Sequence, residues 1–266
     1  MRLQLLENYI AGIIDIMTTQ TSIEWTEQTW NPVTGCTKVS PGCKNCYAET
    51  MTRRLTAMKV KGYENGFEIS EHPERLSTPL LRKIPTVYFV NSMSDLFHEG
   101  VSDSFIDEVL NTIKSTPQHT YQVLTKRAER LPEFFKNRSV PSNMWLGVSV
   151  EDIKYGLPRI KELRKVKAET RFLSIEPLLE DLGKFDLSDI HWVIVGGESG
   201  HGARRMQESW VESIQDQCIA SNVPFFFKQW GAFGQDGIKR NKKANGRTFK
   251  NQIWDENPSR AKQTYP

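Results

Sequence analysis

Short apolar runs and longer amphipathic stretches alternate along most of this chain. The apolar runs are continuous rather than alternating with polar residues, which is typical of parallel strands covered on both faces. Strands are predicted at residues 86–91, 120–124, 144–148, 171–175, 191–195 and 224–227. An earlier strand-like segment lies at Trp30–Thr34.

Amphipathic helices are predicted in the gaps between these strands. Ser102 is a suitable N-cap for the first of them, since its hydroxyl can accept a hydrogen bond from the helix start. The apolar face of this helix carries Phe105, Ile106, Val109, Leu110 and Ile113. Further helices are predicted at residues 127–137, 152–165 and 208–221. Strands that alternate with helices predict βαβ units with right-handed crossovers.

Polar motifs follow nearly every predicted strand instead of gathering at one switch point. This pattern favours a complete or partial (β/α) barrel of six to seven parallel strands over an open doubly wound sheet. We expect the barrel at residues 17–235, a non-native or disordered extension at residues 1–16, and a basic tail at residues 236–266. Neither a signal peptide nor an apolar run of membrane-spanning length is found, so no membrane partner is expected.

Charge is distributed unevenly along the chain, although the formal net charge is only +3. The segment 236–262 holds three acids, Asp236, Asp255 and Glu256, against a larger set of bases. The bases are Lys239, Arg240, Lys242, Lys243, Arg247, Lys250, Arg260 and Lys262. Such a tail could meet phosphates, or it could be a solvated tail without a partner.

Three of the four cysteines lie close together, in the segment GCTKVSPGCKNCYAE. Cys36, Cys43 and Cys46 have the spacing C-x6-C-x2-C, and Pro41-Gly42 supplies a turn before the last pair. Clustered thiols in a Gly/Pro loop gain little from core packing, so this pattern predicts a metal centre. A disulfide framework does not fit a chain of this size, which indicates a reducing cytoplasm.

The number of ligands separates two kinds of centre. Structural zinc takes four protein ligands, and the nearest further candidates are His72 and His98. Cys218 fits a small core residue on its predicted helix instead. A [4Fe–4S] cluster held by three thiolates keeps an open iron position for a substrate or cofactor. We therefore expect an iron–sulfur cluster, with zinc as the alternative.

Residues that are expensive to bury follow each later strand. If the strands are parallel, these residues meet at one rim, and ion pairs that close the barrel mouth are the alternative explanation. The candidates for cofactor binding are Ser92, Ser94, Asp95, Glu151, Gly196, Gly197 and Glu198. The candidates for catalysis are Lys126, Glu176 and Lys228.

The run from Ile23 to Pro258 resembles a family of uncharacterised proteins borne by phages and prophages. The matching pieces, in order, are WNPVTGCTKVSPGCKNCYAE, SMSDLFHE, YQVLTKRAERL, LGVSVE, RFLSIEPLL, WVIVGGESG, PFFFKQWG and NGRTFKNQIWDENP. This resemblance implies a phage context and no particular activity.

The cysteine loop is also similar to that of radical S-adenosylmethionine enzymes, which include DNA-repair lyases. The resemblance implies a [4Fe–4S] cluster on Cys36, Cys43 and Cys46 after the first strand of a partial barrel, with S-adenosylmethionine at the open iron. It also implies an electron donor, and the phage resemblance and basic tail suggest a nucleic-acid or nucleotide substrate. Here the first cysteine spacing is longer than in those enzymes, and Tyr47 follows the last cysteine. Gly196-Gly197-Glu198 follows a late strand, so the role of the similar motif in those enzymes does not transfer.

Two other functions remain open from the sequence. One is a redox-sensing or structural metal protein without turnover. The other is a zinc-stabilised nucleic-acid-binding protein of a phage.

Overall fold

The computed structural model describes residues 19–21 and 23–258. The predicted extension at residues 1–16 and the last part of the predicted tail, residues 259–266, lie outside the described residues. Strands are β1 (Thr19–Gln20), β2 (Gln28–Trp30), β3 (Val33–Thr34), β4 (Ser70–Glu71), β5 (Val87–Val90), β6 (Thr120–Thr125), β7 (Met144–Ser149), β8 (Thr170–Ile175), β9 (Trp192–Gly196), β10 (Phe225–Gln229), β11 (Thr248–Phe249) and β12 (Gln252–Ile253).

The helices alternate with the main strands. The α-helices are α2 (Tyr47–Ala57), α3 (Thr78–Leu81), α4 (Asp103–Lys114), α5 (Arg130–Phe134), α6 (Gly156–Arg164), α7 (Glu208–Ala220) and α8 (Lys242–Asn245). The 3₁₀ helices are η1 (Pro41–Cys43), η2 (Pro73–Arg75) and η3 (Phe135–Asn137). Within the described ranges, no helix has the length and apolar character needed to cross a membrane.

The main sheet has the strand order β1-β2-β5-β6-β7-β8-β9-β10. Its seven strands from β2 onward are parallel, while the short β1 pairs antiparallel with β2. The crossovers between successive parallel strands contain the helices, except the crossover from β8 to β9, where residues 176–191 form no helix. This arrangement is the partial (β/α) barrel that the strand and helix periods predicted. Two further sheets have two strands each, β3 with β4 and β11 with β12.

By their internal contacts, the described residues form two compact units. The first unit extends to residue 37 and also includes residues 48–123 and 140–145. The second unit contains residues 38–47, 124–139 and everything from residue 146 onward. The cysteine loop is therefore divided: Cys36 belongs to the first unit, and Cys43 and Cys46 belong to the second.

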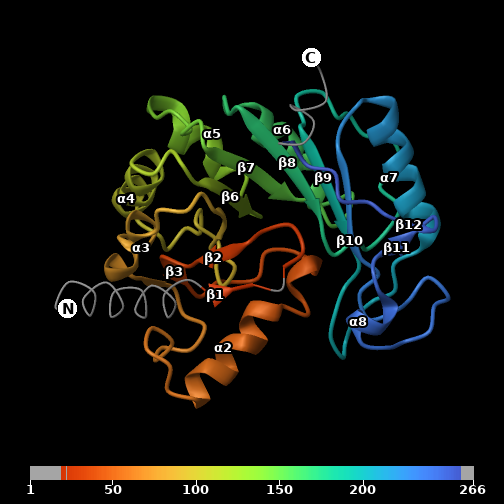
Figure 1. Ribbon diagram of the computed structural model, residues 1–266, viewed down its shortest axis with the longest axis horizontal. Helices are drawn as coiled ribbons and strands as arrows, with labels where there is room; N and C mark the ends of the chain where they lie inside the picture. Colours follow the sequence, from red (N-terminus) through yellow and green to blue (C-terminus); the bar gives the residue numbers. More distant parts are fainter. Residues whose placement is uncertain (1–18, 22, 259–266) are drawn as a thin grey trace. The chain divides into compact units, whose positions relative to one another are not determined.

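The first unit has an aromatic core formed by residues of β2, β5 and β6. The rings of Tyr88 and Tyr121 stack with centroids 5.4 Å apart, and Trp30 meets Tyr121 edge-on at 5.6 Å. The predicted cap is confirmed, because the Ser102 hydroxyl accepts a hydrogen bond from the Phe105 N–H at 3.2 Å. All five residues of the predicted apolar face of α4 are buried. Figure 1 shows α3 and α4 side by side, in agreement with their contacts.

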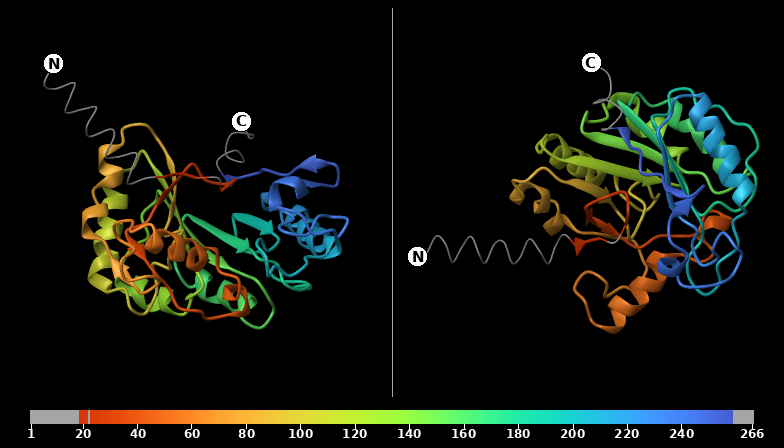
Figure 2. Two further views of the ribbon diagram at one scale, coloured as in Figure 1. Left: turned by 90° about the horizontal axis from the view of Figure 1, so that it is seen from below. Right: turned by 45° about the vertical axis from the view of Figure 1, so that its right-hand side comes forward.

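The second unit has its core between β8–β10 and α7. Every residue of β9 is buried, as expected for a central strand covered on both faces. The helix α7 lies along β10 in Figure 1 and in the right-hand view of Figure 2, and it packs its buried face there. Residues of the predicted tail also pack on β10: the Phe227 N–H donates to Trp254 O, the Trp230 indole donates to Thr248 O, and Phe249 is fully buried.

Several predicted boundaries differ from those observed, and two of the differences have a clear local cause. The strand-like segment Trp30–Thr34 is split into β2 and β3, because Pro32 lacks an N–H group to continue the ladder of hydrogen bonds. The helix predicted at residues 152–165 begins only at Gly156. The Asp152 carboxylate accepts hydrogen bonds from the N–H groups of Tyr155 and Gly156, which forms a turn ahead of the helix.

Candidate metal centre

The backbone before Cys36 is held in the first unit by main-chain contacts. The Gly35 N–H donates to Met93 O, the Cys36 N–H donates to Phe67 O, and Gly35 forms a parallel bridge with Ser94. Gly35 has φ +85°, and a Cβ there would lie 2.0 Å from Glu68 O. Only glycine fits this combination of backbone angle and close approach. The position of Cys36 along its loop is thus fixed by the main chain.

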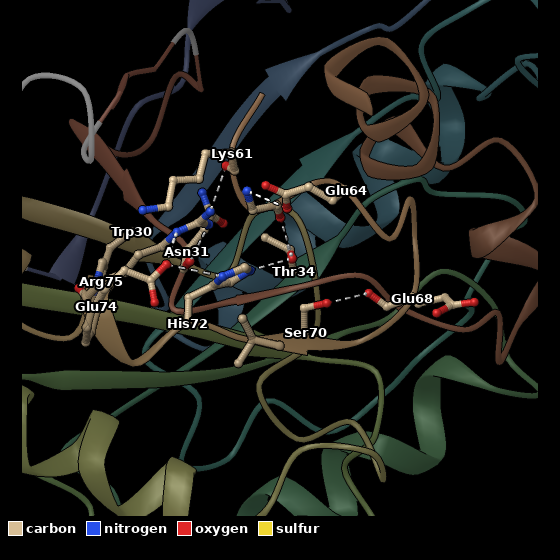
Figure 3. Close-up of polar contacts among 12 residues, drawn as sticks. Trp30, Asn31, Thr34, Lys61, Glu64, Glu68, Ser70, His72, Glu74 and Arg75 are labelled. Carbon is tan, nitrogen blue, oxygen red and sulfur yellow. Dashed lines mark hydrogen bonds and ion pairs between the residues drawn. The ribbon is translucent and has the colours of Figure 1, made fainter. Parts of the chain in front are cut away.

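A buried histidine supports the same segment from the other side. His72 places its ring Nε2 2.8 Å from the Thr34 hydroxyl, and its Nδ1 lies 3.5 Å from the Glu74 carboxylate. Burial lowers the pKa of His72, and the positive charge of Arg75 lowers it further. In Figure 3, His72 lies between Thr34 and Glu74, while Arg75 reaches Asn31 O at 3.1 Å. These contacts tie β3 to the irregular segment around η2.

The residues after β5 lie beside the start of the cysteine loop. Ser94 Oγ donates to Val33 O at 2.8 Å, and Ser92 Oγ donates to the Asn31 side chain at 3.2 Å. Asp95 is buried and accepts a hydrogen bond from the Phe97 N–H at 3.0 Å. Of the predicted group Ser92, Ser94 and Asp95, the structure therefore brings Ser94 next to Gly35, while Ser92 and Asp95 contact Asn31 and Phe97 within the same unit.

In the second unit, the turn that carries Cys43 and Cys46 rests on the carboxyl end of β7. The Cys43 N–H donates to Ser40 O at 3.0 Å and starts the single turn η1. The Ser40 hydroxyl donates to Glu151 Oε1. A Cβ at Gly42 would meet the same Glu151 oxygen at 2.9 Å, so the turn lies directly against this carboxylate.

Glu151 is a fully buried carboxylate held ionised by two cations. Its Oε2 accepts a hydrogen bond from Arg159 Nη1 at 2.6 Å, and Arg159 is only 3% exposed. Burial by itself raises the pKa of Glu151, but the charges of Lys126 and Arg159 and the hydrogen bonds from Ser40 and Arg159 outweigh it, so the pKa is lowered. Lys126 also donates to the Ser149 hydroxyl at 3.1 Å.

A second anchor comes from the loop after β9. The Arg204 guanidinium binds Glu198 through both carboxylate oxygens, at 2.5 and 2.8 Å, and donates to Pro41 O at 3.0 Å. The Asn45 side chain donates to Gly202 O at 2.8 Å. Burial opposes ionisation of Glu198, yet the hydrogen bonds from Arg204 lower its pKa. Glu198 and Arg204 therefore form a bridge from β9 to the cysteine turn.

A third polar group lies at the ends of β8 and β10. Lys228 Nζ binds the Glu176 carboxylate at 2.7 Å, and both side chains are mostly buried. The Gln229 side-chain amide donates to Ser199 Oγ at 3.1 Å and lies near Gly197 O and Glu176. The side-chain carbonyl oxygen of Gln229 is buried without a hydrogen-bond partner. A Cβ at Gly196 would lie 3.3 Å from the Glu176 carboxylate. These predicted strand-end residues are brought together within the second unit.

The available metal donors are thiols. All four cysteines are free, and Cys36, Cys43 and Cys46 are half-buried, whereas Cys218 is buried. Burial raises the pKa of Cys218 to about 12, in keeping with its predicted role as a core residue. Among residues 19–21 and 23–258, no three His, Cys, Asp or Glu side chains gather as a metal site. Thiols are nevertheless the residue type that binds iron–sulfur clusters, so the chemistry of Cys36, Cys43 and Cys46 fits such a cluster.

The two histidines considered as zinc ligands are engaged elsewhere. His98 places Nε2 2.8 Å from the Thr37 hydroxyl and accepts a hydrogen bond from the Gly100 N–H through Nδ1. His72 is held by Thr34 and Glu74, as described above. Neither ring offers a nitrogen to a metal in this arrangement.

Four residues that hold the cysteine turn did not stand out in the sequence: Ser40, Asn45, Arg159 and Arg204. Arg159 carried one detectable signal, since it lies four positions before Leu163 on the apolar face of its predicted helix. A basic residue on such a face indicates a buried partner. Ser40, Asn45 and Arg204 lie in irregular segments without periodicity, so no sequence signal distinguishes them.

The fold and site define a partial (β/α) barrel protein whose cysteine turn is anchored on strand-end carboxylates. Residues 20–258 match the family model described as "Protein of unknown function (DUF5131)", and the chain belongs to this family. No curated protein matches the chain.

Several solved structures show a distant likeness. One is a spore photoproduct lyase variant with dinucleoside spore photoproduct (14% identity, TM-score 0.44, 75% of this chain and 62% of that chain). Another is a variant of the same lyase with bound AdoMet and dinucleoside spore photoproduct (14% identity, TM-score 0.44, 75% and 63%). The chain thus spans less than two thirds of the length of these lyases.

Proposed function

We propose that this protein is an iron–sulfur enzyme of the radical S-adenosylmethionine type. Cys36, Cys43 and Cys46 would hold a [4Fe–4S] cluster, and S-adenosylmethionine would bind at the open iron position. When bound, such a cluster supplies one electron at a time and a coordination position for the cofactor. Cys218 takes no part in this proposal, because it is buried on α7.

One observation carries the proposal: the turn with Cys43 and Cys46 is anchored on residues at the carboxyl ends of β7 and β9. Active sites of (β/α) barrels are built at this end of the strands. The Ser40–Glu151 and Pro41–Arg204–Glu198 contacts hold the turn there. A loop with an accidental cluster of thiols needs no such support, since a buried carboxylate with two cations is costly to assemble.

The anchoring contacts refine the roles of two predicted cofactor-binding residues. Glu151 and Glu198 contact the cysteine turn or its supporting arginine, so we assign them to positioning of the turn. Five others are assigned to the S-adenosylmethionine site: Ser92, Ser94, Asp95, Gly196 and Gly197. In the first unit Ser94 borders Gly35, and in the second Gly196 borders Glu176.

We assign the catalytic roles to Lys126, Glu176 and Lys228. Lys228 and Glu176 form an ion pair in which both side chains keep some exposure, 12% and 20%. The Lys228 ammonium has three N–H donors, so it can contact a substrate carboxylate or phosphate while it stays paired with Glu176. A nucleic-acid or nucleotide substrate, an electron donor, a cytoplasmic setting and a phage context complete the proposal.

The test begins with anaerobic purification of the full chain. We expect a brown protein with about four iron and four sulfide ions per chain. Cys43→Ala should lose most of this iron, whereas Cys218→Ala, the matched control, should keep it. Reduction with dithionite in the presence of S-adenosylmethionine should then release 5′-deoxyadenosine.

Two outcomes would contradict the proposal in different ways. A colourless protein with one zinc ion per chain would contradict the iron–sulfur assignment and favour the zinc-stabilised nucleic-acid-binding protein. An intact cluster that releases no 5′-deoxyadenosine would favour a redox sensor without turnover.

A further inference from the structure

A basic surface in the second unit adjoins the cysteine turn. It is formed by two segments that are distant in sequence, residues 199–208 after β9 and residues 231–247 after β10. Together they contain seven bases against two acids, Glu208 and Asp236. The bases are Arg204, Arg205, Lys239, Arg240, Lys242, Lys243 and Arg247.

The two segments pack against each other through hydrogen bonds and close contacts. The Lys239 ammonium donates to His201 O at 2.5 Å. The Arg205 guanidinium lies over Gly237, where a Cβ would approach its Cζ to 2.5 Å. Nearer the strands, the Ala232 N–H donates to Glu198 O at 2.8 Å. The basic side chains are therefore displayed by one ordered surface.

The segment 231–247 has internal contacts that keep its shape. Phe233 and Lys239 form an antiparallel bridge, and the Arg240 N–H donates to Ala232 O at 2.8 Å. The short α8 follows, and its Asn245 side chain donates back to Gly231 O at 3.0 Å. Lys239 and Lys243 consequently project from a folded segment rather than from a loose tail.

Not all of these charges are neutralised within the protein. Arg204 binds Glu198, and Arg240 binds Asp236 at 2.7 Å. Arg205, Lys239 and Lys243 are exposed, and none of them forms an ion pair with a carboxylate in the described part of the chain. An excess of positive charge therefore remains on the outside of this surface.

The surface is joined directly to the cysteine turn. His201, which holds Lys239, is followed by Gly202, whose carbonyl accepts the hydrogen bond from Asn45. Asn45 immediately precedes Cys46. Arg204, on the same segment, contacts Pro41. A ligand on the basic surface would therefore lie beside Cys43 and Cys46 within the second unit.

We propose that this surface, defined by Arg205, Lys239 and Lys243, binds the phosphodiester backbone of a nucleic-acid strand and presents it to the cysteine turn. The assignment of a reaction to that turn rests on the proposed function; the binding itself does not. A small anion would meet only one or two exposed cations, which solvent and salt screen. A strand with regularly spaced phosphates engages all three at once. A membrane surface is a poorer fit, because Ile238 is the one strongly exposed aliphatic side chain described in these segments.

The test measures binding of the full chain to a fluorescein-labelled oligonucleotide of mixed sequence, by anisotropy over a series of salt concentrations. The triple variant Arg205→Gln/Lys239→Gln/Lys243→Gln should bind about 10- to 100-fold more weakly at low salt. For this variant, the slope of log Kd against the logarithm of the salt concentration should be smaller by about two to three, because each phosphate contact releases roughly one counterion. The matched control removes three exposed lysines elsewhere in the second unit: Lys154→Gln/Lys161→Gln/Lys167→Gln.

Equal weakening in the two triple variants would overturn the proposal, since it would reflect net charge alone. So would an absence of binding by the wild type at low salt, or tighter binding to vesicles with anionic lipid or to an acidic peptide than to the oligonucleotide. Iron and sulfide are measured on the same preparations. Wild-type protein that holds a cluster but does not bind the oligonucleotide would contradict the proposed surface, and wild-type protein that binds the oligonucleotide but holds no cluster would contradict the proposed function.

Discussion

Cys36 and the turn with Cys43 and Cys46 are close in sequence, but they are held by different kinds of contact. At Gly35 and Cys36, main-chain hydrogen bonds hold the segment: Gly35 with Met93, and Cys36 with Phe67. Around Cys43, they are between side chains and the turn: Ser40 with Glu151, and Pro41 with Arg204. The first arrangement depends on backbone shape, and the second depends on charge. Each should therefore fail under a different perturbation.

The largest expected effect comes from removing the cation beside Glu151. Arg159→Met leaves a carboxylate buried with its closest cation gone, and we expect a loss of about 3–5 kcal/mol in the free energy of unfolding. Denaturant unfolding of the wild type and the variant measures this loss. Alkylation of Cys43, followed by mass spectrometry, should speed up more than alkylation of Cys36.

Arg240→Met is the matched control, because it breaks an ion pair of similar length, with Asp236, at the surface. It should leave the stability almost unchanged, since exposed pairs contribute little. A similar loss in both variants would mean that the Glu151 site is not specially sensitive to charge.

A smaller effect is expected from a change of backbone shape before Cys36. Gly35→Ala places a methyl group 2.0 Å from Glu68 O at φ +85°, so the chain must shift, at a cost of about 3 kcal/mol. Gly66→Ala is the matched control, since Gly66 also has a positive φ but has open space where the methyl group would lie. It should cost only about 1 kcal/mol.

Hydrogen exchange would show where each change acts. In Gly35→Ala we expect faster exchange at the amides of Gly35 and Cys36, with little change at Cys43. Faster exchange confined to the Cys43 turn would contradict the proposed difference between the two segments.

The smallest expected effect is that of acid. The pKa of Glu151 and the pKa of Glu198 are both lowered from the ordinary value of 4.5. A lowered folded pKa stabilises the protein above the unfolded value, and this stabilisation is lost as the pH falls through the folded values. Stability should therefore decline below about pH 4.5, and the decline should be shallower in Glu198→Gln. Thermal unfolding between pH 3 and 6 measures this; an unchanged slope in the variant would show that Glu198 does not contribute.

The same comparison explains what could be predicted. The strands β5 to β10 and the helix α4 with its Ser102 cap were predicted closely, because burial imposes a period that the residues repeat. Of the candidate site, the cysteines and the strand-end residues Glu176, Lys228 and Glu198 are predicted by residue type and position, and their roles stay predictions. The partners Arg159 and Arg204 are not predicted, because each ion pair spans a turn, at separations of eight and six residues, and no one helix or strand spans either pair.

The sequence by itself determined the alternation of strands and helices, the cluster of three thiols and the excess of bases near the C-terminus. These features are local, since periodicity, spacing and composition can be read without knowing which segments meet. Only the tertiary structure decided that Glu151 supports Ser40, that Arg204 links Glu198 to Pro41, and that Lys239 lies against His201 beside the cysteine turn. The contacts of Ser40 with Glu151, of Pro41 with Arg204 and of His201 with Lys239 join residues far apart in the chain, and packing of the strands and loops determines which of them come together.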